Sequence, residues 1–218
     1  MKLQHTLVGA SLAALNSLAL AVPLVTSTFD TDTEGWSGIN GVFNFHQVGT
    51  GGQSGGYVRG TDSGSGVVWL FNAPAAYLGD KSSFYGGTLS FYLKQFTVDV
   101  PFVTNLPDVK ISGNGVSIVL DAGLDPGADW TFYSVDLKPG AWHLDTLDGA
   151  LATAADIQTA LANVADLRIR AEYSQTLDVD GLDTVVLSAV PEPQTYLLMM
   201  AGLGVVGFAA RRRGSARG

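Results

Sequence analysis

The chain has 218 residues, a formal net charge of -8 at pH 7 and no cysteine. This length accommodates one ordinary domain with a hydrophobic core and short appendages, but it is short for two full domains. The absence of cysteine excludes disulfides, a thiol nucleophile and thiolate metal sites. The cations of the central region are scattered rather than clustered, which argues against nucleic-acid binding.

The first 21 residues have the features of a secretory signal peptide. Lys2 precedes an apolar stretch over residues 7–20, and Ala19-Leu20-Ala21 forms the small-x-small pattern that signal peptidase requires. A buried N-terminal helix is the alternative, but no polar face recurs at helical spacing. The sequence therefore predicts a signal helix that signal peptidase removes after Ala21.

The central region, residues 22–190, is predicted to be all-β. The whole chain has 27 glycines, and only 15% of its residues are charged, a composition typical of turn-rich β structure. The segment 49–66 is expected to be a loop with at most a short strand at 57–59, and Asn114-Gly115 is the strongest hairpin signal. Strands are expected at residues 67–71, 88–96, 109–120 (two strands), 130–137, 167–173 and 184–188.

One short helix interrupts the strands. Thr153 and Asp156 have the spacing of a capping box, and Ile157, Leu161 and Val164 recur on one helical face. Strands separated by turns, without alternating helices, favour an antiparallel two-sheet sandwich over a parallel α/β fold. The helix is expected to cover one end of that sandwich.

The C-terminal segment, residues 191–218, has three parts in a fixed order. Pro191-Glu192-Pro193 comes first, an apolar run over 196–210 follows, and the run is followed directly by Arg211, Arg212 and Arg213. A helix over this run would span about 22 Å, which is short of the roughly 30 Å hydrocarbon core. The segment therefore predicts a marginal transmembrane helix whose arginines act as a membrane stop and remain cytoplasmic, with the central region on the periplasmic side.

This order closely resembles the PEP-CTERM sorting signal of Gram-negative bacteria that export exopolysaccharide. The resemblance implies that an exosortase recognises Pro191-Glu192-Pro193, removes the tail and so ends a transient attachment to the inner membrane. The paired prolines would hold the motif extended beside the membrane, where a protease can reach it. An ordinary stop-transfer helix is the alternative.

A second resemblance runs through the central region. Its pieces include Glu34-Gly35-Trp36, the segments 85–91 and 167–173, and Gly181-Leu182-Asp183. In this order they are similar to a laminin B (laminin IV type A) domain. The resemblance implies a jelly-roll sandwich of the galactose-binding-like kind, found in extracellular matrix and surface proteins, with no catalytic residues to carry over.

Two sets of side chains are candidate binding residues. Asp30, Asp32 and Glu34 lie around an expected first strand, and Asp178, Asp180 and Asp183 precede the last strand. In a jelly roll these ends pair, so Asp30, Asp32 and Asp183 are the candidate ligands of a structural calcium ion; the alternative is that these acids form turns. Aromatic rings can stack on pyranose faces, although most rings in strands belong to a core. The candidate rings are Trp69, Tyr92, Trp130 and Trp142, and Trp142 is the preferred glycan contact because it follows the Pro139-Gly140 turn.

Together these features predict a noncatalytic exported protein, sorted by an exosortase to the cell surface or extracellular matrix of a Gram-negative bacterium. Its expected partners are exopolysaccharide or surface glycans. The sequence leaves two alternatives open. One is a purely structural matrix or floc protein without a defined ligand, and the other is a divergent glycan-active enzyme that uses paired carboxylates.

Overall fold

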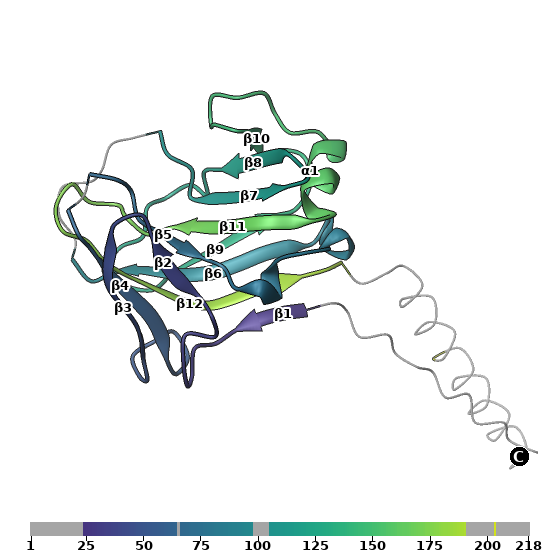
Figure 1. The fold of residues 1–218 in the computed structure, drawn as a ribbon. Coiled ribbons are helices and arrows are strands. Elements are labelled where there is room, and N and C mark those ends of the chain that lie inside the picture. Colours follow the sequence, from purple (N-terminus) through teal and green to yellow (C-terminus); the bar gives the residue numbers. More distant parts are fainter. Residues whose placement is uncertain (1–23, 65, 98–104, 191–202, 204–218) are drawn as a thin grey trace, which may run out of the picture. The chain divides into compact units, whose positions relative to one another are not determined.

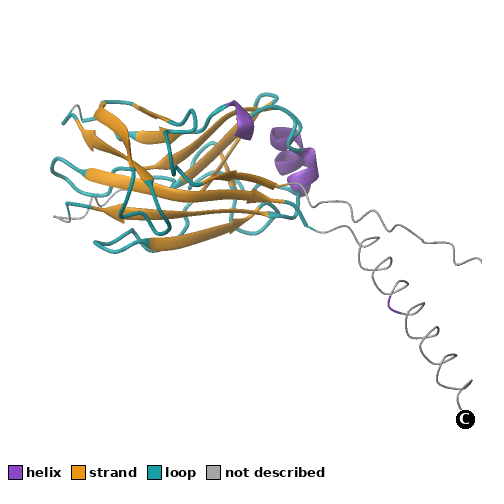
Figure 2. Cartoon of the chain, turned by 90° about the horizontal axis from the view of Figure 1, so that it is seen from below, coloured by secondary structure: helices purple, strands orange, loops and turns teal. Residues whose placement is uncertain are grey.

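The computed structural model describes residues 24–64, 66–97 and 105–190, together with the single residue Leu203. The described region is a sandwich of two six-stranded antiparallel sheets with one short α-helix at one end of the strands (Figures 1 and 2). The predicted fold class, an all-β two-sheet sandwich with a single helix, is confirmed. The predicted signal helix and the tail from Pro191 to Arg213, with its membrane stop, lie outside the described residues except for Leu203.

Sheet A has the strand order β3-β4-β12-β6-β9, and β1 also pairs with β12. The long strand β12 pairs with β4 through its first half and with β1 through its second half, while β6 lies along its other side. The strands of sheet A are β1 (Leu24–Ser27), β3 (Val42–Val48), β4 (Tyr57–Asp62), β6 (Thr88–Gln95), β9 (Thr131–Asp136) and β12 (Val179–Ser188).

Sheet B has the strand order β10-β8-β7-β11-β5-β2. Strands β7 and β8 form a hairpin in this sheet, and its turn residues Asn114 and Gly115 both have positive φ, at 48° and 77°. These angles match the two-residue hairpin turn that Asn-Gly favours. The strands of sheet B are β2 (Ser37–Ile39), β5 (Leu70–Asn72), β7 (Val109–Gly113), β8 (Val116–Leu120), β10 (His143–Leu144) and β11 (Val164–Arg170).

The core lies between the two sheets. In β6, Leu89, Phe91 and Leu93 are buried and alternate with partly exposed residues, because successive side chains of a strand point to opposite faces. In sheet B, Phe71 and Ile169 are fully buried in the same cluster. Full burial of each such side chain contributes about 1.5–3 kcal/mol. The sandwich is therefore held together mainly by apolar residues that alternate along its strands.

The helix α1 (Ala154–Leu161) begins at the predicted capping box. Thr153 accepts a hydrogen bond from the backbone of Asp156, and the Asp156 carboxylate accepts one from the backbone of Thr153. Ile157 and Leu161 are buried, and the helix packs on β7 and β8. Two short 3₁₀ helices, η1 (Ala75–Tyr77) and η2 (Ser82–Phe84), lie between β5 and β6. The predicted helix is confirmed in type and in its capped start, but it ends at Leu161, and Val164, which was predicted on its apolar face, begins β11 instead.

Some strand bounds differ from the predicted ones. β11 begins at Val164 and ends at Arg170, and β12 begins at Val179, five residues before the expected start. Strands β2, β3 and β10 were not predicted. A first strand was expected near Asp30 without bounds, and β1, at Leu24–Ser27, pairs with the last strand, β12. In the described part of the chain, no helix is long and apolar enough to cross a membrane.

Candidate carbohydrate-binding surface

One row of residues crosses the outer face of sheet A. Gly181 in β12 pairs with Arg59 of β4 on one side and with Lys94 of β6 on the other. Their neighbours along the strands, such as Val58, Leu93 and Leu182, are buried in the core. Because side chains alternate along a strand, Arg59 and Lys94 point away from the core. The row therefore faces outward, with a glycine at its centre.

Three aromatic rings pack over that glycine. A Cβ atom on Gly181 would lie 2.9 Å from the Phe96 ring, 3.0 Å from the Trp130 ring and 3.2 Å from the Tyr57 ring. Tyr57 and Phe96 are stacked with ring centroids 5.4 Å apart, and Trp130 meets Tyr57 edge-on at 5.3 Å. The indole N–H of Trp130 donates to the carbonyl of Gly51 at 3.0 Å. The missing side chain thus allows the rings to rest directly on the sheet.

Two cations lie against these rings. The guanidinium carbon of Arg59 is 4.7 Å from the Phe96 ring centroid, and the Lys94 ammonium is 4.9 Å from the same centroid. Such cation–π contacts contribute about 0.5–1 kcal/mol at exposed sites. Neither cation lies within ion-pairing distance of an acidic side chain of the described region. Both therefore keep their charge available to an external anion.

The aromatic character continues along β6 and β9. Tyr92 pairs with Phe132 across the two strands, with ring centroids 5.0 Å apart, and Phe132 is 56% exposed. Tyr92 lies on the same face as Lys94 because the two are two residues apart in one strand. We call the group on this outer face the aromatic surface; it consists of Tyr57, Arg59, Tyr92, Lys94, Phe96, Trp130 and Phe132. It offers ring faces for sugar stacking and cations for carboxylate or sulfate groups.

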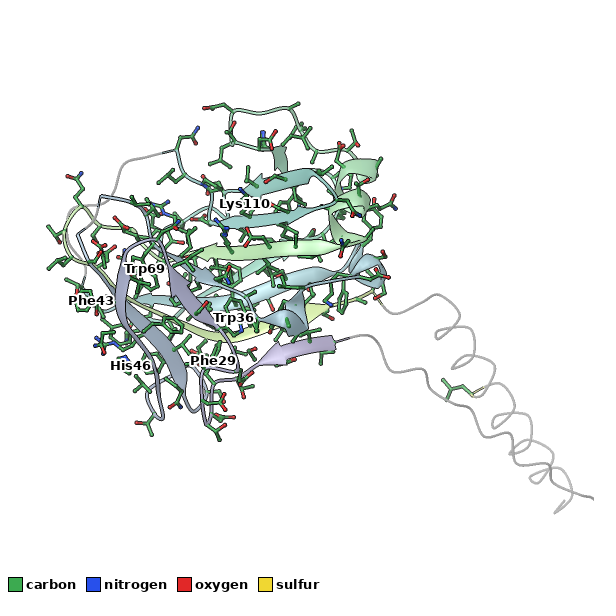
Figure 3. All side chains as sticks on the ribbon, viewed as in Figure 1. Phe29, Trp36, Phe43, His46, Trp69 and Lys110 are labelled. Carbon is green, nitrogen blue, oxygen red and sulfur yellow. The ribbon has the colours of Figure 1, made fainter. Side chains whose placement is uncertain are left out.

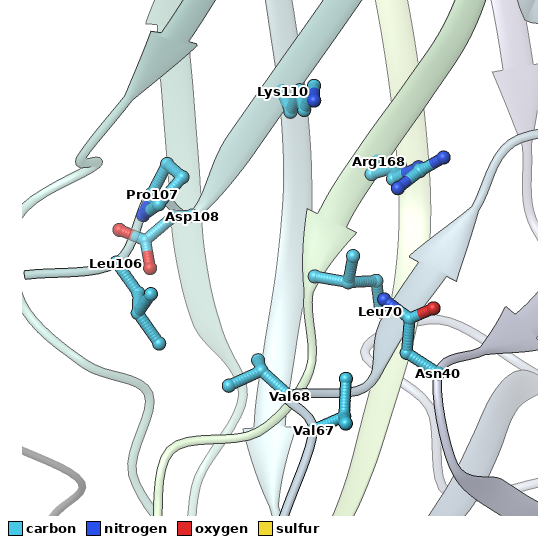
Figure 4. Close-up of a pocket in the computed structure, with 9 residues that line it drawn as sticks. All are labelled: Asn40, Val67, Val68, Leu70, Leu106, Pro107, Asp108, Lys110 and Arg168. Carbon is cyan, nitrogen blue, oxygen red and sulfur yellow. The ribbon is translucent and has the colours of Figure 1, made fainter. Parts of the chain in front are cut away.

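The outer face of sheet B has a cavity of about 240 Å³ (Figure 4). Leu70, Lys110 and Arg168 come from adjacent strands, and segments that include Val67 and Leu106 border them. Arg168 is paired with Asp166 at 2.7 Å. The lining contains no aromatic ring. This cavity can hold a small group, but it lacks a platform on which a sugar ring could stack.

Asp108 also lines this cavity and is almost fully buried. Burial raises its pKa to about 6, although hydrogen bonding from the backbone of Ala122 and the charge of Arg170 act in the opposite direction. The carboxylate accepts hydrogen bonds from the backbone of Ala122 at 2.7 Å and from the Tyr173 hydroxyl at 3.1 Å. Asp108 is therefore a buried acid that titrates close to neutral pH.

Of the four aromatic residues that were candidate glycan contacts, two lie in the core and two lie on the outer face of sheet A. Trp142 has no exposed area, and its indole N–H donates to the carbonyl of Asp136 at 2.7 Å. The prediction that Trp142 contacts glycans is wrong, because its ring belongs to the core beneath the turn. Trp69 is likewise fully buried, between the sheets (Figure 3). Tyr92 and Trp130, in contrast, belong to the aromatic surface.

The three carboxylates predicted to bind calcium accept hydrogen bonds near two turns. In the glycine-rich loop, the backbone N–H of Gly56 donates to the Asp30 carboxylate at 3.5 Å, and the backbone N–H of Ser54 donates to the Asp183 carboxylate at 3.2 Å. Asp32 accepts a bond from the backbone of Glu34 at 2.6 Å. Burial raises the pKa of Asp183. Among the described residues, no three acidic or histidine side chains are arranged to hold a metal ion.

Five residues of the aromatic surface were not predicted as parts of a site: Tyr57, Arg59, Lys94, Phe96 and Phe132. The role of Gly181 beneath the rings was not predicted either. One signal was present in the sequence, since alternation over 88–96 places Tyr92, Lys94 and Phe96 on one face. The register that brings Trp130 and Gly181 beside them depends on pairing between distant strands and leaves no local pattern. Pro191, Glu192, Pro193 and Arg211, Arg212 and Arg213 lie outside the described residues.

Comparison with known proteins identifies two regions. Residues 70–197 match the family model for laminin B (Domain IV), and residues 189–213 match the PEP-CTERM protein-sorting motif. Among curated proteins, human laminin subunit alpha-3 is 32% identical over 104 residues, which is 46% of this chain. The mouse basement membrane-specific heparan sulfate proteoglycan core protein is 28% identical over 128 residues, or 58% of this chain. The matched stretches make up only 3% of each of these relatives.

Two solved structures share the fold. The L4b domain of human laminin alpha-2 superposes with a TM-score of 0.51 at 18% identity, covering 56% of this chain and 70% of that one. The family 11 carbohydrate-binding module of a cellulosomal cellulase of Clostridium thermocellum gives 0.50 at 14% identity, covering 79% and 98%.

Both resemblances stated from the sequence are thus confirmed. The sorting motif and the laminin-like domain together indicate an exported protein of the cell surface or the extracellular space. Because the matched model spans more than half of its length, the chain belongs to the laminin B (Domain IV) family.

Proposed function

We propose that this chain is a noncatalytic protein of a bacterial surface or extracellular matrix, and that its sandwich associates with exopolysaccharide through the aromatic surface. Signal peptidase would remove residues 1–21. An exosortase would then act at Pro191-Glu192-Pro193 while the apolar run and the arginines hold the tail in the inner membrane. In this route the sandwich passes through the periplasm before it reaches the surface.

The aromatic surface is the observation that carries the binding proposal. On this face Phe132 is exposed and Tyr92, Phe96 and Trp130 are partly exposed, whereas Tyr57 is buried. Apolar rings are costly to leave in water, and several of them gathered on one face are typical of a binding site. Ring faces complement the apolar face of a pyranose, while Arg59 and Lys94 can bind uronate or sulfate groups. The sheet itself positions these groups, because all of them lie on or beside the paired strands β4, β12, β6 and β9. A largely preformed platform reduces the entropic cost of binding.

The fold is compatible with this role, since a carbohydrate-binding module shares it. At 14% identity that likeness concerns the fold alone, so the binding proposal depends on the side chains of this chain. A structural calcium ion at Asp30, Asp32 and Asp183 remains a separate prediction. In the described structure these carboxylates accept hydrogen bonds within turns.

Affinity electrophoresis of the full chain in a mild detergent would test the binding proposal. Exopolysaccharide from the host strain is cast into the gel, with dextran as the uncharged comparison. The parent should be retarded, and the double variant Tyr92→Ala, Phe132→Ala should bind about tenfold more weakly, because each ring contact is worth about 0.5–1.5 kcal/mol. Leu124→Ala, which removes an 86% exposed apolar side chain in a loop, is the matched control and should behave like the parent.

The same experiment separates the alternatives. If the parent migrates unchanged at every polysaccharide concentration, the protein is structural and has no glycan ligand on this surface. If incubation with the polysaccharide releases new reducing ends, the protein is an enzyme. Retardation of the parent and the double variant to the same extent would place binding elsewhere on the molecule.

A further inference from the structure

The basic residues of sheet A all lie on its outer face. Its strands contain three of them, His46 in β3, Arg59 in β4 and Lys94 in β6. His46 is directly opposite Arg59 in the pairing of β3 with β4 (Figure 3). Arg59 and Lys94 in turn pair with Gly181 from its two sides. Paired residues point to the same face of a sheet, so the three side chains form one outward-facing row.

The acids of the same strands do not neutralise this row. Asp62 and Asp180 are buried at inward-facing positions. Asp183 points outward but is also fully buried, and its carboxylate accepts backbone N–H bonds. Asp136 is exposed at the far end of β9, where it pairs with Lys138 at 2.9 Å. The chain carries 20 acidic residues against 12 lysines and arginines, so a basic row runs against its overall composition.

Arg59 and Lys94 are gathered around one aromatic ring. The guanidinium carbon of Arg59 and the ammonium nitrogen of Lys94 lie 4.7 Å and 4.9 Å from the centroid of Phe96. Lys94 also lies 6.0 Å from the centroid of the Trp130 ring. Like charges held around one ring repel each other, and neither has an acidic partner in the described region. An anion bound between them would relieve this repulsion.

The groups in this row fit a sugar that carries a carboxylate. The guanidinium of Arg59 is a planar fork of N–H donors that matches the two oxygens of a carboxylate, while Lys94 adds a point charge. Phe96 and Trp130, which pack over Gly181 beside both cations, can contact the apolar face of the same sugar. A uronic acid has both features, an apolar pyranose face and a carboxylate.

His46 extends the row toward the edge of the sheet. Its Nδ1 lies 2.7 Å from the carbonyl oxygen of Asn44, which fixes the orientation of the imidazole ring. A proton on Nδ1 that bonds this carbonyl leaves Nε2 as an acceptor for a sugar hydroxyl. The row therefore offers a hydrogen-bonding group one strand away from the two cations.

We propose that the aromatic surface selects an acidic polysaccharide, and that a uronate carboxylate binds between Arg59 and Lys94 beside the Phe96 ring. This inference rests on the proposed function, because it concerns the same surface, and it adds the chemical class of the ligand. The rings bind the sugar, and the cations distinguish a charged polymer from a neutral one. A neutral polysaccharide would contact the rings alone and leave both cations unpaired.

Affinity electrophoresis of the full chain in a mild detergent tests this with one polymer in two forms. Exopolysaccharide from the host strain is used as isolated and after reduction of its carboxyl groups to alcohols, which removes charge but keeps the sugar rings. The parent should bind the native polymer at least about tenfold more tightly, because charge-assisted hydrogen bonds are the stronger ones. Raising the salt from about 0.05 M to about 0.5 M should weaken binding of the native polymer alone, because salt screens charges.

Paired variants assign this preference to the two cations. Arg59→Gln, Lys94→Gln should bind both forms as weakly as the parent binds the reduced polymer; this residual binding would show that the rings remain in place. Arg59→Lys, Lys94→Arg keeps both charges and should keep most of the preference. The matched control is Lys110→Gln, Arg168→Gln, which removes the same two charges from the outer face of sheet B and should behave like the parent.

The outcomes separate this inference from the proposed function. If both forms retard the parent equally and Tyr92→Ala, Phe132→Ala loses that retardation, the surface binds glycans regardless of charge and the inference is overturned. A full preference for the native polymer in Arg59→Gln, Lys94→Gln would overturn it as well. If neither form retards the parent, the proposed function itself fails. Dextran sulfate is a further comparison, and retardation by it as strong as by the native polymer would reveal a site for any polyanion rather than for a uronate.

Discussion

Gly181 determines how closely the aromatic surface rests on sheet A. Its neighbours Phe96, Trp130 and Tyr57 would lie 2.9–3.2 Å from an added Cβ atom. We expect Gly181→Ala to push these rings outward, to cost about 1 kcal/mol of unfolding free energy through overpacking and to weaken polysaccharide binding. Urea unfolding and affinity electrophoresis measure the two effects. Gly127→Ala is the control, because an added Cβ atom there would have no neighbour within 4 Å. Equal effects of the two substitutions would contradict this role of Gly181.

Asp108 should make stability depend on pH. Its pKa is raised from 3.8 to about 6 in the folded protein, mainly by burial. The folded state therefore binds a proton more readily than the unfolded state, so the contribution is complete below pH 3.8 and is lost as the pH rises through 6. A pKa shift of this size corresponds to a change of at most about 3 kcal/mol in the free energy of unfolding. The groups that act on Asp108 are Arg170, Asp121 and Tyr173.

Urea unfolding between pH 4 and pH 7 measures this dependence. Asp108→Asn, which cannot titrate, should have a flatter pH profile than the parent. Asp136→Asn replaces an exposed acid paired with Lys138 and should leave the profile unchanged. A profile of Asp108→Asn with the same slope as the parent would assign the dependence to other acids.

At the scale of elements, the capping box of α1 has a measurable contribution. Removing the Thr153 hydroxyl leaves the backbone N–H of Asp156 without its partner. We expect Thr153→Ala to lower the unfolding free energy by about 1 kcal/mol, as measured in urea. Thr159→Ala, on the same helix, removes an exposed hydroxyl that bonds the carbonyl of Ala155 and should cost little. A Thr153→Ala protein as stable as the parent would show that packing on β7 and β8 alone holds the helix.

The elements that the sequence could predict carry local signals. β6 alternates over its whole length, Asn114-Gly115 has the residues of a tight hairpin turn, and α1 has both a cap and an apolar face. The strands that were missed lack such signals. β2 and β10 have three and two residues, and β3 contains an irregular register between Phe43 and His46, beside Asn44 with its positive φ. Such short strands are stabilised by hydrogen bonding to neighbouring strands that are distant in sequence. A local sequence pattern does not show which distant segments will pair.

Candidate site residues were harder to predict for the same reason. The turn before Trp142 is exposed, yet the ring points into the core, where the carbonyl of Asp136 accepts its N–H. A local pattern indicates where a turn lies but not to which side its next ring points. Acidic residues near β12 were recognised as candidate ligands, but only tertiary contacts show that Asp183 is hydrogen-bonded while Asp180 is not.

At the scale of the whole molecule, we expect the C-terminal segment, residues 191–218, to determine whether the sandwich stays in the inner membrane or is released. We expect replacement of Pro191-Glu192-Pro193 by three alanines to leave export intact but to keep the protein in the inner membrane. The apolar run and the arginines would persist while the exosortase loses its recognition motif. Cell fractionation with an intact-mass comparison measures the result, and Gln194→Ala, directly after the motif, is the control. Release of the triple-alanine protein at the parental level would exclude sorting through this motif.

If sorting delivers the sandwich and the aromatic surface then retains it on polysaccharide, both steps can be measured together in the producing cell. It compares the share of protein in the extracellular matrix and in the cell-free medium for the parent, for Tyr92→Ala, Phe132→Ala and for Leu124→Ala. All three proteins should be exported and processed alike. The parent and Leu124→Ala should remain in the matrix, and the double variant should move into the medium. A double variant retained in the matrix to the same extent as the parent would show that the aromatic surface does not hold the protein there.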